Sequence, residues 1–441
     1  MLRSLILRTL IVNCGINGLG LANSILLSHW LGPTGRGEIA AAMLWPMLLA
    51  YLSNLGIISA TSYFAASRAT KLQPIFSNAM ALALIQSLVA VAIGYAALPF
   101  LLHSQSANVI NSARLFLLVI PVTLSAQYAT SILQGRMHMT AFNWLRTIIP
   151  FGYLVGTVAM AMSGRLVVIN IILLHLGLSG LTWLGAMSAL YRIGIRAPRR
   201  IDPETGKDML KYGAKVHTGD VSGLANQSLD QVLMAAWLPP VYLGLYVVAV
   251  SAASVSGIFS GTVQMVATPS ITQRKTQAER AAVLQGVFRR YWLLSFVMAA
   301  VFAAILPLAI PLVFGSSFKA AVWPAEVLLI GVFLLGAREV LAGGARALGD
   351  PWLGSKAQIG ALFVTVLLLY FLLPSMGIMG AAIASSAACA AQLLIVIAGL
   401  RNSHAIPPMS LFRITAGDLG SAFRVFDLFR PKREGLLPGQ G

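Results

Sequence analysis

Long apolar runs alternate with short polar stretches along the whole chain. A helix that crosses a membrane needs about 20 mostly apolar residues. On that template the sequence predicts about twelve spans, whose ends carry an error of a few residues. They cover about residues 7–31, 38–62, 76–99, 113–133, 142–163, 166–190, 216–238, 243–268, 291–314, 321–343, 355–373 and 377–400. The pattern therefore predicts an all-α polytopic membrane protein.

One polar stretch between two spans occurs twice in altered form. Residues 30–39 read WLGPTGRGEI, and WLPPVYLGLY follows 207 positions later. The shared register indicates an internal duplication. We expect Gly32, Gly35 and Gly37 to supply the unusual backbone angles that reverse the chain at this turn. The matched pairs are Trp30 and Trp237, Pro33 and Pro240, and Gly37 and Gly244.

The duplication predicts two six-helix lobes around a central cleft. Residues 1–190 form the first lobe and residues 216–400 the second. Between them lies a basic loop at 191–215, and a basic, aromatic tail follows at 401–441. Because each lobe begins on the same side of the membrane, the lobes are predicted to be parallel repeats.

Charge distribution sets the predicted orientation. The sequence is 58% hydrophobic with 10% charged residues and a net charge of +18. A nucleic-acid binder would gather its basic residues on one folded surface. Here 25 of the 31 Lys and Arg fall instead in alternate connections and the two termini. That asymmetry predicts cytoplasmic N- and C-termini and excludes nucleic acid as a partner.

Polar residues inside two spans form the candidate substrate-cavity or ion-coupling site. The 207-residue shift places Asn13 opposite Asp220 and Asn23 opposite Asp230. Each set shares one helix face, which must avoid lipid and is predicted to line the cleft. The alternative is that these groups only hold helices together. The full candidate set is Asp220, Asp230, Asn226, Gln227 and Gln231 in the seventh span, with Asn13, Asn17 and Asn23 in the first.

Other ionisable residues receive structural interpretations at this stage. Arg36 and Glu38 are expected to fix the turn, and His175 to be a hydrogen-bonded core residue. Neighbouring residues on a helix point about 100° apart, so Arg338 and Glu339 are not expected to pair with each other. The sequence contains no phosphate-binding Gly-Lys-Ser/Thr loop, clustered Cys and His ligands or nucleophile elbow. We therefore expect no enzyme, no metal and no cofactor.

Three stretches together resemble a known family. Residues 31–39 (LGPTGRGEI), residues 229–246 with Leu229-Asp230-Gln231, and residues 346–351 (RALGDP) are similar to bacterial polysaccharide-biosynthesis flippases. These belong to the multidrug/oligosaccharidyl-lipid/polysaccharide exporter superfamily. The resemblance implies translocation of an undecaprenyl-diphosphate-linked oligosaccharide to the outer leaflet of the bacterial inner membrane, by alternating access, in an O-antigen or exopolysaccharide pathway.

The resemblance also implies partners and site residues. Flippases of this kind hold the diphosphate with cations, and the cations available here are Arg36, Arg114, Arg146 and Arg338. A membrane carboxylate could couple transport to H⁺ or Na⁺. The expected partners are the lipid-linked oligosaccharide, the bilayer and other polysaccharide-assembly membrane proteins. The main alternative is a cation-coupled multidrug antiporter of the same fold. A membrane-embedded polymerase or ligase is the third hypothesis.

Overall fold

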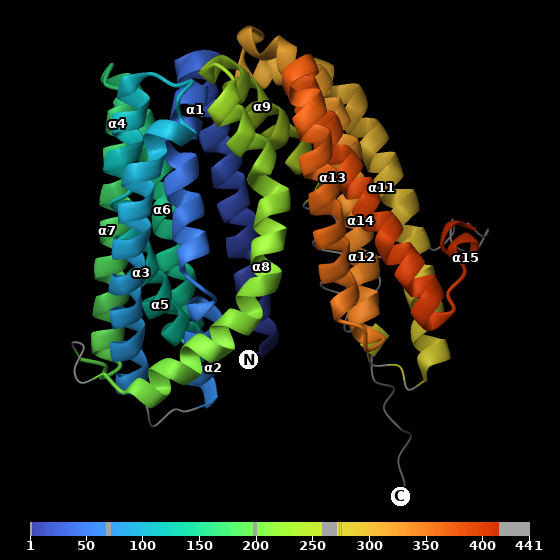
Figure 1. Cartoon of the computed structure of the whole chain (residues 1–441), viewed down its shortest axis with the longest axis horizontal. Coiled ribbons are helices and arrows are strands. Elements are labelled where there is room, and N and C mark those ends of the chain that lie inside the picture. Colours follow the sequence, from blue (N-terminus) through green and yellow to red (C-terminus); the bar gives the residue numbers. More distant parts are fainter. Residues whose placement is uncertain are drawn as a thin grey trace, which may run out of the picture. The chain divides into compact units, whose positions relative to one another are not determined.

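The computed structural model describes residues 2–67, 72–196, 201–257, 271–272, 274 and 276–413. Side chains of residues 2–10, 218–220, 222 and 225 lie outside this description. Every regular element in the described part is a helix, which confirms the predicted all-α class (Figure 1). The helices are α1 Leu2–Ser53, α2 Ile57–Ser67, α3 Leu72–Leu101, α4 Ala107–Phe116, α5 Val119–Gly135, α6 Met139–Met162, α7 Val168–Arg192, α8 Pro203–Trp237, α9 Pro240–Ser254, α11 Gln277–Phe314, the 3₁₀ helix η2 Ser316–Ala321, α12 Val322–Ala347, α13 Trp352–Met376, α14 Ile378–His404 and α15 Pro408–Phe412.

Nine helices in the described residues are long and apolar enough to cross a membrane. One of these is the stretch Ile11–Ser53, which covers most of the first and the second predicted span. The apolar helix α9 is shorter than a full span, and α8 is not among the nine. The chain is a multi-pass membrane protein, and the count of twelve spans stays a prediction.

The residues form two compact units. The first comprises Met1–Ser251, Leu308–Val322 and Leu373–Met379. The second comprises Ala252–Pro307, Trp323–Leu372 and Gly380–Gly441. Both α8 and most of α9 therefore cluster with the first unit. The predicted lobe boundary at residues 191–215 stays a prediction.

Helix α5 lies at the centre of the first unit, in contact with α2, α3, α6 and α7. Its Tyr128 is fully buried and donates its hydroxyl to Gln86 Oε1 at 2.6 Å. Burial of such a ring is favourable only when its hydroxyl finds a partner. The pair therefore links α5 to α3, and the same hydroxyl lies 3.2 Å from the Asn54 carbonyl oxygen.

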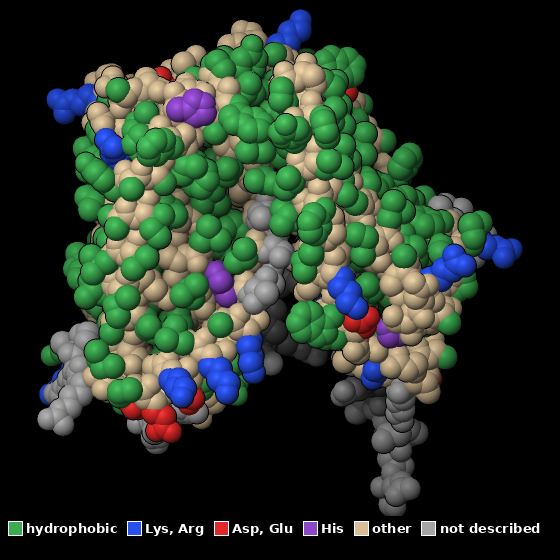
Figure 2. Space-filling view, in the orientation of Figure 1, with side chains coloured by type: hydrophobic (Ala, Val, Ile, Leu, Met, Phe, Trp, Pro, Cys, Tyr) green, Lys and Arg blue, Asp and Glu red, His purple; other side chains and the backbone are tan. Residues whose placement is uncertain are grey.

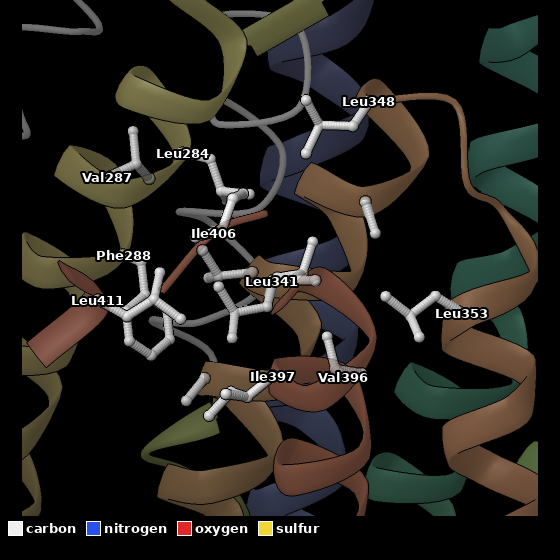
Figure 3. Packing of buried hydrophobic residues seen from close by; sticks show 14 of the residues in the cluster. Leu284, Val287, Phe288, Leu341, Leu348, Leu353, Val396, Ile397, Ile406 and Leu411 are labelled. Carbon is white, nitrogen blue, oxygen red and sulfur yellow. The ribbon is translucent and has the colours of Figure 1, made fainter. Parts of the chain in front are cut away.

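The second unit packs around one apolar core contributed by α11, α12, α13, α14 and the segment after α14 (Figure 3). Phe288 and Leu341 are fully buried in it. Ile406 and Leu411, from the start of the predicted tail, belong to the same core. Arg289 Nη1 donates to the Ser410 carbonyl at 3.1 Å, which ties this segment to α11. The rest of the predicted basic, aromatic tail, residues 414–441, lies outside the described residues.

This docking predicts that Leu411→Ala destabilises the protein by about 2–5 kcal/mol, because truncation of a buried leucine leaves a cavity. The matched control is Met409→Ala, since Met409 is 78% exposed two residues away. Thermal unfolding of the detergent-solubilised variants measures the difference. Equal melting temperatures for the two variants would show that the segment does not contribute to the core.

The turn between the first two spans is shorter than predicted. Gly32 alone breaks α1, with φ 65° and ψ −175°, and the helix resumes through Pro33. Proline suits the first turn of a helix because it has no N–H to leave unpaired. Of the three glycines expected to carry unusual backbone angles, only Gly32 does so. Arg36 and Glu38 consequently lie on a helix rather than in a loop, which corrects the sequence-based interpretation.

Gly37 allows α1 and α9 to approach closely, and its own backbone angles are not unusual. A Cβ atom at Gly37 would overlap the carbonyl oxygen of Pro240, and a Cβ atom at Gly244 would overlap the carbonyl oxygen of Pro33. Small residues let helices cross with their backbones in contact. The 207-residue shift relates Pro33 to Pro240 and Gly37 to Gly244, so each glycine lies against the proline of the other repeat. The internal repeat in the sequence therefore corresponds to two helices that cross through equivalent residues.

The first part of α8 is an amphipathic segment at the end of the first unit. Tyr212 stacks on Tyr63 at 4.6 Å between ring centroids, and Gly213 lies against the backbone of Leu55 and Gly56. Lys207, Lys211 and Lys215 are exposed. Figure 2 shows Lys, Arg, Asp and Glu side chains at this lower end of the unit and further Lys and Arg at its upper end, with flanks covered by hydrophobic side chains between them. This distribution agrees with a membrane-spanning bundle whose two ends are in water.

Candidate functional site

A cavity of about 630 Å³ opens inside the first unit. The two parts of α1 supply most of its wall at helical spacing, so one face of each part is directed inward. Helices α6, α7, α8 and α9 complete it. Its lining residues are Ile16, Asn17, Gly20, Asn23, Ser24, Leu27, Arg36, Ile39, Ala40, Met43, Leu44, Met47, Ile149, Pro150, Tyr153, His175, Gln231 and Val247.

Arg36 provides a cation in this wall. It lies one turn after the break at Gly32, on the part of α1 that faces the cavity. Its Nε atom is buried with no hydrogen-bond partner among the described residues. The cavity lining contains no carboxylate within the same described part of the chain. An arginine in such surroundings favours an anionic ligand, because within the described residues its Nε has no partner and no carboxylate of the cavity lining faces its charge.

Three amide side chains line the same cavity as Arg36. Asn23 is 6% exposed and donates its Nδ2 to the Pro150 carbonyl at 3.2 Å, while its Oδ1 is buried with no partner in the described residues. Asn17 and Gln231 line the same cavity. Three of the eight polar residues that the sequence singled out are therefore brought together with Arg36.

Two aromatic residues line the cavity although the sequence analysis did not place them in the site: His175 was assigned to the core, and Tyr153 was not singled out. The Tyr153 ring lies 5.6 Å from the His175 ring, and His175 also packs edge-on against Phe116 at 5.3 Å. The Nδ1 atom of His175 is buried without a partner among the described residues. The imidazole borders the cavity, and the prediction of a hydrogen-bonded core histidine stays a prediction. His175 shares one helix face with Ser179 and Thr182. Tyr153 likewise shares a face with Arg146 and Thr157, so helical spacing was the signal that could have marked both residues.

Asp230 lies near the cavity but has protein partners. It is 6% exposed, accepts the Tyr246 hydroxyl, and accepts the Gln231 backbone N–H at 2.7 Å. The carboxylate therefore links α8 to α9 and is absent from the residues that line the cavity. The Asp220 side chain lies outside the described residues.

The remaining candidates of the two polar faces are dispersed. Asn13 has a buried Oδ1 without a partner among the described residues. Asn226 is half-buried and has interactions of its own, and Gln227 is exposed. None of the three lines the cavity.

Three other arginines occupy different surroundings. Arg114 stacks over the Tyr95 ring, 4.6 Å from its centroid. Arg146 lies 5.2 Å from the Phe142 centroid and lines a smaller cavity of about 240 Å³, which shares Ile16 and Ile149 with the larger one. Arg146 is therefore the second cation close to the site.

Arg338, in the second unit, is 4% exposed and pairs with Glu339, contrary to the expectation for adjacent residues. Its long side chain bridges the angular offset between neighbouring helix positions. The Nη2 atom donates to the Gly354 carbonyl at 3.1 Å. These contacts satisfy much of the guanidinium inside the protein, so Arg338 has less capacity left for a ligand than Arg36.

No group of three or more His, Cys, Asp and Glu in the described residues could hold a metal ion. The polar groups around the cavity are one guanidinium, three amides, hydroxyls and an imidazole. Such a set can bind a phosphate or a sugar through hydrogen bonds and charge.

Comparisons with known proteins agree with this membrane architecture. A family model described as "Polysaccharide biosynthesis protein" matches residues 4–275. A search of curated proteins returned no match. Among solved structures, the chain is similar to one titled "Lipid II flippase MurJ, inward closed conformation", with a TM-score of 0.71 and 13% identity, covering 95% of this chain and 92% of that one.

Two transporters of a second kind share the fold. The first is titled "Inward-facing conformation of a multidrug resistance MATE family transporter of the MOP superfamily", with a TM-score of 0.68, 13% identity and 96% and 99% of the two chains covered. The second is "MATE transporter ClbM in complex with Rb+", with a TM-score of 0.53, 15% identity and 96% and 97% covered. At these identities the likeness shows the fold alone, and the proteins that share it are flippases and transporters.

Proposed function

We propose, since this chain belongs to the family of polysaccharide biosynthesis proteins, that it is a flippase for a lipid-linked oligosaccharide. Its substrate is an undecaprenyl-diphosphate-linked glycan, moved by alternating access from the cytoplasmic to the outer leaflet of a bacterial inner membrane. Both termini face the cytoplasm in this proposal, as the positive-inside pattern predicts. Other polysaccharide-assembly membrane proteins are the proposed protein partners.

The observation that supports this substrate is Arg36 in a cavity whose described lining residues include no carboxylate. A diphosphate carries negative charge on several oxygens, and a guanidinium donates to such oxygens in pairs. The buried Nε of Arg36 has no partner among the described residues, so ligand binding would satisfy it. Arg146 in the neighbouring cavity offers a second guanidinium on the same side of α6. The amides of Asn17, Asn23 and Gln231 supply further donors and acceptors.

A cation-coupled multidrug antiporter is the second candidate, because the fold is shared with MATE transporters. A cavity for cationic drugs would present a carboxylate to its ligand. Asp230 instead accepts the Tyr246 hydroxyl and does not line the cavity in the described residues. The charge of the cavity therefore favours the flippase over the antiporter.

The two functions are separated by complementation. A strain without its own flippase, carrying the gene cluster for the corresponding glycan, should regain surface polysaccharide when it expresses this protein. A drug-sensitive strain without its extrusion pumps should gain no resistance. Rescue of drug resistance without surface polysaccharide would reverse the assignment.

Coupling to H⁺ or Na⁺ is proposed at Asp230, because a carboxylate in a membrane helix changes charge on protonation or ion binding. We expect Asp230→Asn to lower transport about tenfold at normal protein abundance. The matched variant Tyr246→Phe removes the hydroxyl donor and keeps the carboxylate, so it should retain its dependence on the ion gradient. The measurement is glycan export in cells treated with an ionophore for each ion. Full, gradient-dependent export by Asp230→Asn would remove Asp230 from the coupling step.

A further inference from the structure

A second pocket in the first unit lies on the other side of the helix that carries Arg36. It has a volume of about 470 Å³ and is bordered by Glu38 of α1, the start of α4 and residues 167–169 at the start of α7. Residues two apart on a helix point about 200° away from each other. Arg36 therefore borders one cavity and Glu38 the other, from nearly opposite faces of one helical turn.

Most polar side chains of this pocket have no hydrogen-bond partner among the described residues. Glu38 is half-buried, and no ion pair or hydrogen bond of its carboxylate exists among the described residues. Ser112 is 6% exposed and borders the pocket, and its hydroxyl has no partner in the same part of the chain. Asn108 and Asn111 are exposed and likewise unpartnered there. Ser106 accepts the Val109 N–H at 3.4 Å and retains its own O–H as a donor.

The hydrogen-bond donors and acceptors of this pocket indicate which class of ligand it fits. A carboxylate, two amides and two hydroxyls match vicinal sugar hydroxyls, which both donate and accept hydrogen bonds. Val167 and Ile169, both exposed at the edge, offer an apolar surface to the C–H face of a sugar ring. No Lys or Arg borders the pocket in the described residues, so a phosphate would meet only the Glu38 charge. A single carboxylate in so large a space is also a poor cage for a metal ion, which needs several oxygens at close range.

We propose that this pocket is a carbohydrate subsite for a neutral or N-acetylated sugar residue, distinct from the Arg36 cavity. Its size falls within the range of about 300–1,000 Å³ that small-molecule sites occupy. As a subsite for the translocated glycan, it rests on the proposed flippase function. The two cavities then divide recognition by charge, with the anionic group at Arg36 and an uncharged sugar at Glu38.

The test uses saturation-transfer NMR on the full chain in nanodiscs, with glucose, N-acetylglucosamine and glucuronate as separate probes. Glucose or N-acetylglucosamine should receive saturation, and glucuronate about tenfold less, because its carboxylate meets that of Glu38. The double variant Glu38→Gln, Asn111→Ala should lower the neutral-sugar signal about tenfold. Both side chains are at least partly exposed, so folding is expected to be retained. The matched control is Thr34→Ala, an exposed residue on the same turn outside the pocket.

Equal neutral-sugar signals for the double variant and wild type, no signal in wild type, or stronger binding of glucuronate would each overturn the subsite. Pyrophosphate binding serves as the independent arm and should depend on Arg36 but not on Glu38. Absent sugar binding with restored surface polysaccharide in complementation would refute the subsite and leave the flippase function standing. Sugar binding that depends on the pocket, in a protein that fails to restore surface polysaccharide, would support the subsite and refute the flippase function.

Discussion

Arg36→Gln is expected to lower surface polysaccharide about ten- to hundredfold in a complemented flippase-null strain, at unchanged protein abundance. The glutamine keeps a polar side chain in the cavity but removes the charge and the paired donors. Hydrogen bonds to charged groups contribute about 1.5–3 kcal/mol each, which corresponds to that range. Quantitative detection of surface glycan against membrane-inserted protein measures the effect.

Three further variants make the result specific. Arg36→Lys keeps the charge without the bidentate geometry and should give an intermediate level. Arg146→Gln, beside the neighbouring cavity, should reduce export less than Arg36→Gln. Arg114→Gln should stay near wild type, because Arg114 stacks on Tyr95 and borders neither the Arg36 cavity nor the smaller one beside it. If Arg114→Gln and Arg36→Gln were equally defective, the assignment of the anion to the Arg36 cavity would be wrong.

Gly37→Ala and Gly244→Ala are each expected to lower the melting temperature of the purified protein by about 2–8 °C and to reduce export. The added methyl group meets a backbone carbonyl in both cases, so no side chain can rotate away. Overpacking of this kind costs about 1–3 kcal/mol. To accommodate the methyl group, α1 and α9 must move apart where Pro33 and Pro240 lie against the two glycines.

Gly18→Ala is the matched control for both glycine variants. Gly18 also lies in α1, and a Cβ atom there has nothing within 4 Å. Alanine has the higher helix propensity, so this variant should melt at or slightly above the wild-type temperature. Thermal unfolding followed by tryptophan fluorescence in detergent compares the three. A Gly37→Ala protein as stable as Gly18→Ala would show that the crossing is not closely packed.

The helices were predictable because each membrane span requires a long apolar run, which can be recognised in the sequence. The pairing of Gly37 with Gly244 was predictable only as a correspondence between repeats. That the two glycines cross, each against the proline carbonyl of the other repeat, depends on packing between segments more than 200 residues apart. The local sequence around either glycine does not indicate that the two segments are in contact.

The role of Arg36 was misjudged for a local reason. A Gly/Pro-rich stretch was interpreted as a loop, whereas the helix resumes at Pro33 directly after Gly32. Helical periodicity then directs Arg36 and Met43 to one cavity and Glu38 to the opposite side. The sequence analysis correctly marked residues 32–38 as polar. The direction of their side chains depends on Gly32, whose positive φ is the single break in the helix.

The polar faces of the first and seventh spans were partly informative. Asn17, Asn23 and Gln231 line the cavity, yet Asp230 is engaged by Tyr246 from α9. Tyr246 corresponds to Ile39 in the first repeat, so the duplication itself gave no hint of this hydrogen bond. Tyr153 and His175 come from α6 and α7, two predominantly apolar helices in which polar residues are few. Only the tertiary arrangement joins them to the site.

Translocation in proteoliposomes tests the central proposal most directly. Vesicles are loaded with an undecaprenyl-diphosphate-linked oligosaccharide in both leaflets, and an enzyme added outside cleaves the exposed glycan. With the wild-type protein, cleavage is expected to proceed well beyond the half that protein-free vesicles allow, and Arg36→Gln vesicles should remain near that half. Cleavage that stops at half in wild-type vesicles under every imposed ion gradient would contradict the flippase assignment.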